Sequence, residues 1–107
     1  MKILVTGVNG LVGNSIIKIL SKSDHKVFKS SRRIEGLADH KVDITLKDDL
    51  ELFFAKFNPD VVINSAAMAN VDLCETEKKS CDDVNINGVR NLVDVCLKYD
   101  CHLTHIS

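Results

Sequence analysis

The chain has 107 residues, of which 45% are hydrophobic and 27% are charged, and its formal net charge is −1. This length suits one globular domain, and a nearly neutral chain lacks the basic excess typical of proteins that bind nucleic acid or membrane surfaces. No apolar run approaches the roughly 18 residues of a membrane span, and the N-terminus shows no signal-peptide pattern. We therefore expect a cytoplasmic protein that binds neither nucleic acid nor membranes.

The opening residues predict a strand, a glycine-rich turn and a helix. Residues 2–6 are apolar and rich in β-branched side chains, and Gly7, Gly10 and Gly13 follow at intervals of three before a helix over about 10–20. Glycine lets a backbone turn sharply and approach a ligand, and the free N–H groups that begin a helix attract anions. The spacing differs from the commonest dinucleotide fingerprint, so by itself it also fits a plain glycine-rich turn.

The rest of the chain alternates strands with helices. Strands are predicted over 26–29, 40–44, 60–64 and 102–106, with a loop over 30–38. One helix is expected to begin at a capping-box pattern, Thr45 with Asp48, and to end at Asn58-Pro59. Another helix is predicted over about 78–99. The apolar faces expected from helical spacing are formed by Val12, Ile16, Ile17 and Leu20, by Leu50, Phe53, Phe54 and Phe57, and by Val84, Gly88, Val89, Leu92, Val93 and Cys96.

This alternation predicts an α/β fold, a Rossmann-like doubly wound parallel sheet with strand order 3-2-1-4-5 that is truncated after the fifth strand. Ligands of such sheets bind at the carboxyl ends of the strands, where the direction of winding reverses. The glycine turn follows the first strand and a loop of small residues, 65–70, follows the fourth. Both therefore border one crevice, where we expect a dinucleotide.

The glycine turn is expected to hold the pyrophosphate of that dinucleotide. Gly7 makes the turn, Gly10 lets the phosphates approach, and Gly13 lets the helix pack closely on the strand. Backbone N–H groups of Leu11 and Val12 complete the anion site. Asn9 lies within the same turn and is included among the cofactor-binding candidates.

Residues 30–33 follow the second strand with two serines and two arginines, and Ser31, Arg32 and Arg33 are the candidates there. NAD-specific sites often carry an acidic residue at this point to hold the ribose 2′-OH, and none follows here. Arginine forks suit a 2′-phosphate, so we predict NADP(H) in preference to NAD(H), with Arg32 as the first candidate. The competing interpretation is a solvated basic loop.

Two further groups complete the predicted site. Asp43 can accept a hydrogen bond from the adenine amino group while Ile44 packs on the ring, although Asp43 also fits a plain polar residue at a strand end. Small residues after the fourth strand suit a nicotinamide-ribose, which gives the candidates Ser65, Ala66, Ala67 and Met68. Asn85 on the last predicted helix needs hydrogen-bond partners if it is partly buried. We expect it to anchor the backbone of the fourth strand, and the alternative is that it orders water near the nicotinamide.

The cysteines and histidines predict no metal site. Cys74, Cys81, Cys96 and Cys101 form no Cys-x-x-Cys pair, and free thiols of this kind are commonly buried. His102 and His105 lie three apart on a strand, so their side chains point to opposite faces.

The motifs together resemble the extended short-chain dehydrogenase/reductase family. In chain order they lie at 6–13, 42–45, 59–67, Val71-Asp72 with Glu75, Val84-Asn85-x-x-Gly88 with Asn91-Leu92, and 105–107. The resemblance implies a nicotinamide-dependent reduction of a 4-keto sugar nucleotide, in which a Tyr-x-x-x-Lys pair and a Ser or Thr handle the proton and the oxyanion. Two alternatives stay open: an NAD-dependent sugar-nucleotide epimerase or dehydratase, and a non-catalytic regulator similar to the methionine adenosyltransferase beta subunit.

The chain departs from the family pattern in its catalytic residues. Its single tyrosine, Tyr99, is followed by Leu103 at the position of the lysine, and Ser107 precedes the expected active-site Ser or Thr. We therefore expect residues 1–107 to form a partial NAD(P)-binding domain with no catalytic residue, whose sugar nucleotide would need a further C-terminal part. We expect weak dinucleotide binding, no turnover, and self-association through the exposed edge of the fifth strand.

Overall fold

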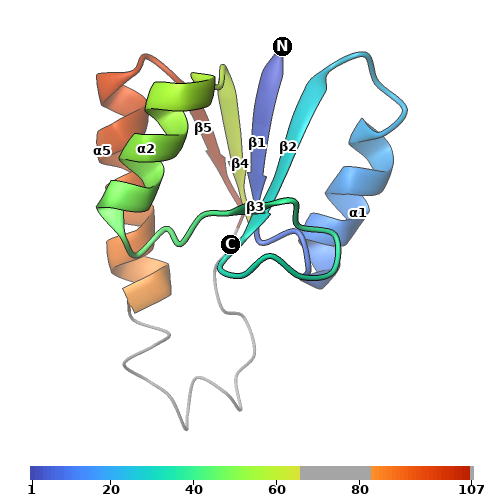
Figure 1. Cartoon of the computed structure of the whole chain (residues 1–107), viewed down its shortest axis with the longest axis horizontal. Helices are drawn as coiled ribbons and strands as arrows, with labels where there is room; N and C mark the ends of the chain where they lie inside the picture. Colours follow the sequence, from blue (N-terminus) through green and yellow to red (C-terminus); the bar gives the residue numbers. More distant parts are fainter. Residues whose placement is uncertain (66–82, 107) are drawn as a thin grey trace, which may run out of the picture.

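The computed structural model describes residues 1–65 and 83–106, which form a parallel sheet flanked by helices. In chain order the elements are β1 (Lys2–Thr6), α1 (Leu11–Leu20), β2 (Lys26–Ser31), β3 (His40–Lys41), α2 (Lys47–Phe57), β4 (Val61–Asn64), the π-helical segment η1 (Asp83–Gly88), α5 (Val89–Lys98) and β5 (His102–His105). The strand order is β3-β2-β1-β4-β5, which confirms the predicted topology. Helix α1 covers one face of the sheet, and α2 and α5 cover the other (Figure 1).

Alternation along the strands divides the buried side chains between the two faces. On the α1 face lies the aliphatic core, made of Ile3, Val5, Val8 and Ala38 with Ile16, Ile17, Leu20, Val27, Val61 and Ile63 packed against it. On the other face lies the aromatic core, made of Leu4, Phe28, Val42, Ile44, Leu50, Phe53, Phe54, Val62, Leu92, Val95 and Cys96. Strand β1 supplies both, and its middle is buried on both sides as expected of a central parallel strand.

Polar side chains replace apolar ones where the central strands end. Thr6 and Asn64 are paired in register and buried, and the Thr6 hydroxyl donates to Asn64 Oδ1 at 2.5 Å. Asn64 Nδ2 lies 3.0 Å from Nδ1 of His105, its register partner on β5. This row satisfies buried polar groups and ties three strand ends together beside the crevice.

Two predicted boundaries and the capping box are wrong. Strand β2 continues to Ser31, and β3 ends at Lys41 because the chain turns at Asp43. The backbone N–H and the hydroxyl of Thr45 both donate to Asp43 Oδ1, at 3.0 and 2.6 Å. Thr45 is thus used in this turn, and the residue that caps α2 is Leu46, without a side-chain hydrogen bond.

The predicted buried faces of the helices hold with two exceptions. Val12 and Val93 are 46% and 40% exposed, whereas Leu50, Phe53 and Phe54 are buried as predicted. Asn58 ends α2 in the left-handed conformation, with φ of 46°. The side chains of residues 83–85, including Val84, lie outside the described set. Residues 78–82 of the predicted helix also lie outside the described residues.

The end of α5 brings two cysteines together. Asp100 adopts φ of 54°, and the Cys101 N–H donates to the Cys96 carbonyl at 2.8 Å, which is the hydrogen bond of a Schellman motif. Cys96 is buried, Cys101 is half-buried, and both are free thiols. The hydrogen bond between the two thiols lowers the pKa of Cys96 and outweighs the opposing effect of burial. The same hydrogen bond and burial together raise the pKa of Cys101. Cys74 and Cys81 lie outside the described residues.

Residues 1–65 and 83–106 contain no helix long and apolar enough to cross a bilayer. Within the same ranges, no three His, Cys, Asp or Glu side chains are grouped so as to hold a metal ion. Strand β5 pairs with β4 and forms one edge of the sheet. Self-association through that edge stays a prediction.

Candidate functional site

The β1–α1 turn has the geometry of an anion-binding loop. Gly7 adopts φ of 67°, a conformation that favours glycine, and the Gly10 N–H donates to the Gly7 carbonyl at 3.1 Å. Gly10 caps α1 without a side-chain hydrogen bond, and the first turn of α1 has no acidic residue. The first N–H groups of α1 are therefore available to an external acceptor.

Gly13 and Gly10 differ in how much space a side chain would have. A Cβ built on Gly13 would lie 2.2 Å from the Gly7 carbonyl oxygen and 2.9 Å from Ser65 Oγ, so α1 packs against the turn at a distance that only glycine allows. A Cβ on Gly10 would lie 3.4 Å from the same carbonyl oxygen, which is ordinary contact. The space beside Gly10 is thus open in the protein alone, as a cradle for a diphosphate requires.

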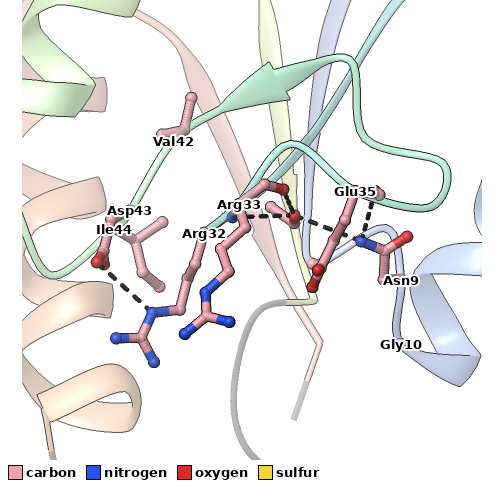
Figure 2. Close-up of a pocket in the computed structure, with 10 residues that line it drawn as sticks. Asn9, Gly10, Arg32, Arg33, Glu35, Val42, Asp43 and Ile44 are labelled. Carbon is pink, nitrogen blue, oxygen red and sulfur yellow. Dashed lines mark hydrogen bonds and ion pairs between the residues drawn. The ribbon is translucent and has the colours of Figure 1, made fainter.

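A cavity of about 320 Å³ extends from this turn toward the loops after β2 and β3. The residues that line it are Gly7, Asn9, Gly10, Ser31, Arg32, Arg33, Glu35, Val42, Asp43 and Ile44. It joins the predicted pyrophosphate site to the predicted ribose and adenine sites (Figure 2). Three separate segments of the chain therefore meet at one site.

Arg32 and Asp43, predicted to contact different parts of the cofactor, form an ion pair. Arg32 Nε lies 3.5 Å from Asp43 Oδ2, with the Asp43 side chain 14% exposed and the Arg32 side chain 58% exposed. The terminal nitrogens of Arg32 point away from Asp43 in Figure 2. Since the Asp43 carboxylate also accepts from Thr45, it holds both the local turn and the arginine.

Glu35 is a cavity residue that the sequence reasoning missed. It lies four residues beyond the end of β2, on a segment without regular structure, and its side chain lines the cavity beside Arg33 (Figure 2). A carboxylate is the group expected to accept from a ribose 2′-OH. The sequence signal was an acidic residue a few positions later than the end of β2, where NAD-binding sites often have one.

Of the other predicted residues, those that the structure describes do not line this cavity. The Ser65 hydroxyl donates to the Thr6 carbonyl at 2.6 Å, so it joins β4 to β1. The side chains of Leu11 and Val12 are exposed, and their proposed role needs only the backbone. Ala66, Ala67 and Met68 lie outside the described residues, as does the side chain of Asn85.

A doubly wound parallel sheet with a glycine turn at its switch point defines the class of Rossmann-like nucleotide-binding domains. The chain belongs to the family described as "RmlD substrate binding domain", whose model matches residues 1–107. This confirms the resemblance to the extended short-chain dehydrogenases/reductases.

The proteins that this chain resembles are much longer than the chain itself. The dTDP-4-dehydrorhamnose reductase of Aggregatibacter actinomycetemcomitans is 32% identical over 106 residues, 99% of this chain and 34% of its own length. The crystal structure of a hypothetical dTDP-4-dehydrorhamnose reductase from Sulfolobus tokodaii is 38% identical with a TM-score of 0.87, and 100% of this chain matches 39% of it. Thermus thermophilus UDP-glucose 4-epimerase in complex with NAD is 28% identical with a TM-score of 0.84, over 96% of this chain and 36% of that one. The chain thus spans about a third of the length of the curated relatives it matches.

Proposed function

We propose that residues 1–107 are the cofactor-binding domain of an oxidoreductase that uses NADP(H) in preference to NAD(H). The proposed reaction of the parent protein is the reduction of a 4-keto sugar nucleotide in dTDP-rhamnose biosynthesis. The reductase relatives support this substrate class. The single observation that carries the cofactor proposal is the cavity that runs from the glycine turn to the two arginines after β2.

Each part of this cavity has a proposed role toward the dinucleotide, which supplies the hydride when it is bound. The first N–H groups of α1 bind the diphosphate, because they lack side-chain acceptors. Asp43 fixes Arg32 through Nε, which leaves the terminal nitrogens of the guanidinium for a 2′-phosphate. Beyond the cavity, the small residues predicted for the nicotinamide-ribose, Ser65 to Met68, keep that proposed role.

The test compares NADPH and NADH by calorimetric titration of the chain and of Arg32→Ala. Losing one charge-assisted phosphate contact should weaken NADPH by roughly tenfold while NADH changes by less than about twofold. Arg90→Ala is the matched control, since this exposed arginine lies on α5. Equal affinity for both cofactors in the wild type, unaffected by Arg32→Ala, contradicts the proposed preference.

A second candidate is the cofactor domain of an NAD-dependent sugar-nucleotide epimerase or dehydratase. The Glu35 carboxylate in the cavity favours it, because an acidic group suits a free 2′-OH and repels a 2′-phosphate. The epimerase relative with NAD supports the same alternative. A wild type that binds NADH more tightly than NADPH selects this second candidate.

We propose further that this 107-residue chain turns nothing over by itself. Its only tyrosine, Tyr99, is not followed by the lysine of the family pair, and the Tyr99 hydroxyl lies 3.4 Å from Glu51 Oε2 on α2. That end of α5 is remote from the glycine turn (Figure 1). Incubation with NADPH and a dTDP-4-keto sugar should give no loss of NADPH absorbance, and measurable turnover overturns this proposal.

A further inference from the structure

Asn9 occupies the glycine turn, but its side chain is directed toward another segment. Asn9 Nδ2 donates to the Glu35 carbonyl at 2.9 Å, and Asn9 Oδ1 accepts from the Leu37 N–H at 2.9 Å. A backbone N–H can only donate and a backbone carbonyl can only accept, so these partners fix which way the amide faces. Nδ2 also lies 3.4 Å from Ser31 Oγ. Both ends of the Asn9 amide are therefore used within the protein, and Figure 2 shows the contacts of the Nδ2 end.

Gly36, between the two residues that Asn9 binds, makes room for this contact. It adopts φ of 56°, and a Cβ built there would lie 2.3 Å from Asn9 Oδ1. The Asn9 amide thus lies across a position that has no side chain, and it pairs with the backbone on either side of it. The conformation of Gly36 and the two hydrogen bonds are separate observations of the same close approach.

Residues 32–37 need an attachment of this kind because they are all exposed and have no regular structure. Hydrogen bonds between near neighbours, such as that from the Ala38 N–H to the Glu35 carbonyl, shape the segment without attaching it to the glycine turn. Burial begins again only at Ala38. The side-chain amide of Asn9 therefore attaches the middle of the segment to the turn between β1 and α1.

We infer that Asn9 is a positioning residue that holds segment 31–37 against the glycine turn and so sets the selectivity of the cavity for the 2′ group of the cofactor. This inference rests on the proposed function and gives Asn9 a different role from direct cofactor contact. The glycine turn bears the proposed diphosphate site, and the held segment bears Arg32, Arg33 and Glu35. Fixing that segment before binding lowers the ordering cost when the cofactor arrives.

The affinity test uses adenosine 2′,5′-bisphosphate and adenosine 5′-monophosphate as probes, because they differ only in the 2′-phosphate. Asn9→Ala should weaken the bisphosphate by about tenfold, the loss expected for one to two net hydrogen bonds, and bring its affinity close to that of the monophosphate. Asn14→Ala, an asparagine in the first turn of α1, is the matched control and should keep the wild-type ratio. Wild-type selectivity in Asn9→Ala overturns the inference.

A second readout requires no ligand. The Leu37 N–H should exchange with deuterium at least about tenfold faster in Asn9→Ala than in the wild type, because its acceptor is lost. Asn9→Asp keeps an acceptor oxygen and should restore most of that protection. Unchanged exchange at Leu37 in Asn9→Ala contradicts the attachment itself, whatever the affinities are.

A double-mutant cycle with Gly36→Ala separates this inference from the proposed function. Gly36→Ala should weaken the bisphosphate strongly in the wild-type background and much less in Asn9→Ala, because the clash with Oδ1 is then absent. Strictly additive effects overturn the inference. Failure of the wild type to bind either probe refutes the proposed cofactor site and leaves the exchange result at Leu37 as the test of the attachment.

Discussion

The face of the sheet beneath α2 and α5 is packed with aromatic rings, whereas the face beneath α1 is packed with aliphatic side chains. Phe53 and Phe57 have ring centroids 4.7 Å apart, and Phe54 and Tyr99 have centroids 5.4 Å apart. Two ion pairs, Lys47–Asp94 and Lys98–Glu51, also join α2 to α5. On the α1 face, Ile16, Ile17 and Leu20 are only partly buried.

This difference shows that the two faces of one small sheet meet different packing requirements. The close approach of Gly13 to Gly7 requires α1 to lie near the β1 turn, and larger core side chains would hold the helix away from it. The aromatic core carries no such constraint, so it can bury larger rings and contribute more to folding. We therefore assign stability mainly to the aromatic face, and the close helix packing that shapes the proposed diphosphate site to the α1 face.

The largest effect is expected from truncation in the aromatic core. Phe54 is fully buried, so Phe54→Ala should lower the free energy of unfolding by about 3–5 kcal/mol. Ile16→Ala on the α1 face should cost only about 1 kcal/mol, because that side chain is partly exposed. Urea unfolding of the two variants measures the difference, and equal losses would remove the proposed division between the faces.

The next effect concerns the close approach of α1. Gly13→Ala should destabilise the protein by about 1–3 kcal/mol, because a backbone carbonyl 2.2 Å from the new Cβ cannot move aside easily. Replacing an ordinary helical glycine by alanine stabilises a protein, so the sign of the change in the free energy of unfolding is informative. A Gly13→Ala variant that unfolds at higher urea concentration than the wild type contradicts the packing described for this turn.

A smaller effect is expected on cofactor choice. Glu35→Gln removes a negative charge from the cavity and should tighten NADPH by about twofold to fivefold, since exposed charges interact weakly. NADH should bind no more tightly than before. Calorimetric titration gives both affinities, and a loss of NADH binding with no gain for NADPH favours the NAD-dependent alternative instead.

The smallest effect comes from an exposed ion pair between the helices of the aromatic face. A hydrogen bond from Lys98 to Glu51, reinforced by the charge of Glu51, raises the pKa of Lys98. A raised lysine pKa gives a stabilisation that is complete below the ordinary value of 10.5 and is lost as pH rises through the folded-state pKa.

Lys98→Gln should therefore lower the unfolding midpoint slightly at neutral pH and have no effect above the folded-state pKa. Lys22→Gln, in the turn after α1, is the control and should show no such trend. Thermal unfolding across this pH range provides the measurement. A difference between wild type and Lys98→Gln that grows with pH contradicts the assigned contact.

Local pattern was sufficient to predict the strands and the glycine turn, because these depend on neighbouring residues. The strand order followed from the alternation of strands and helices, which indicates a doubly wound parallel sheet. Thr45 was misread because threonine serves both in a capping box and in turns closed by an aspartate, and here its N–H and hydroxyl donate to Asp43. Glu35 was missed because its position depends on the hydrogen bonds that Asn9 makes with the Glu35 carbonyl and the Leu37 N–H, 26 and 28 residues further along the chain. The ion pair between Arg32 and Asp43 likewise joins two loops that no periodicity relates.

The central claim is that a diphosphate binds where β1 passes into α1. Titration of the wild type and of Gly10→Ala with NADPH tests it most directly, because the added methyl meets only ordinary contact in the protein alone. We predict that Gly10→Ala lowers the free energy of unfolding by only about 1 kcal/mol, because alanine is a poorer N-cap than glycine, and weakens NADPH by at least about tenfold. Wild-type affinity for NADPH in a normally folded Gly10→Ala variant would contradict the account.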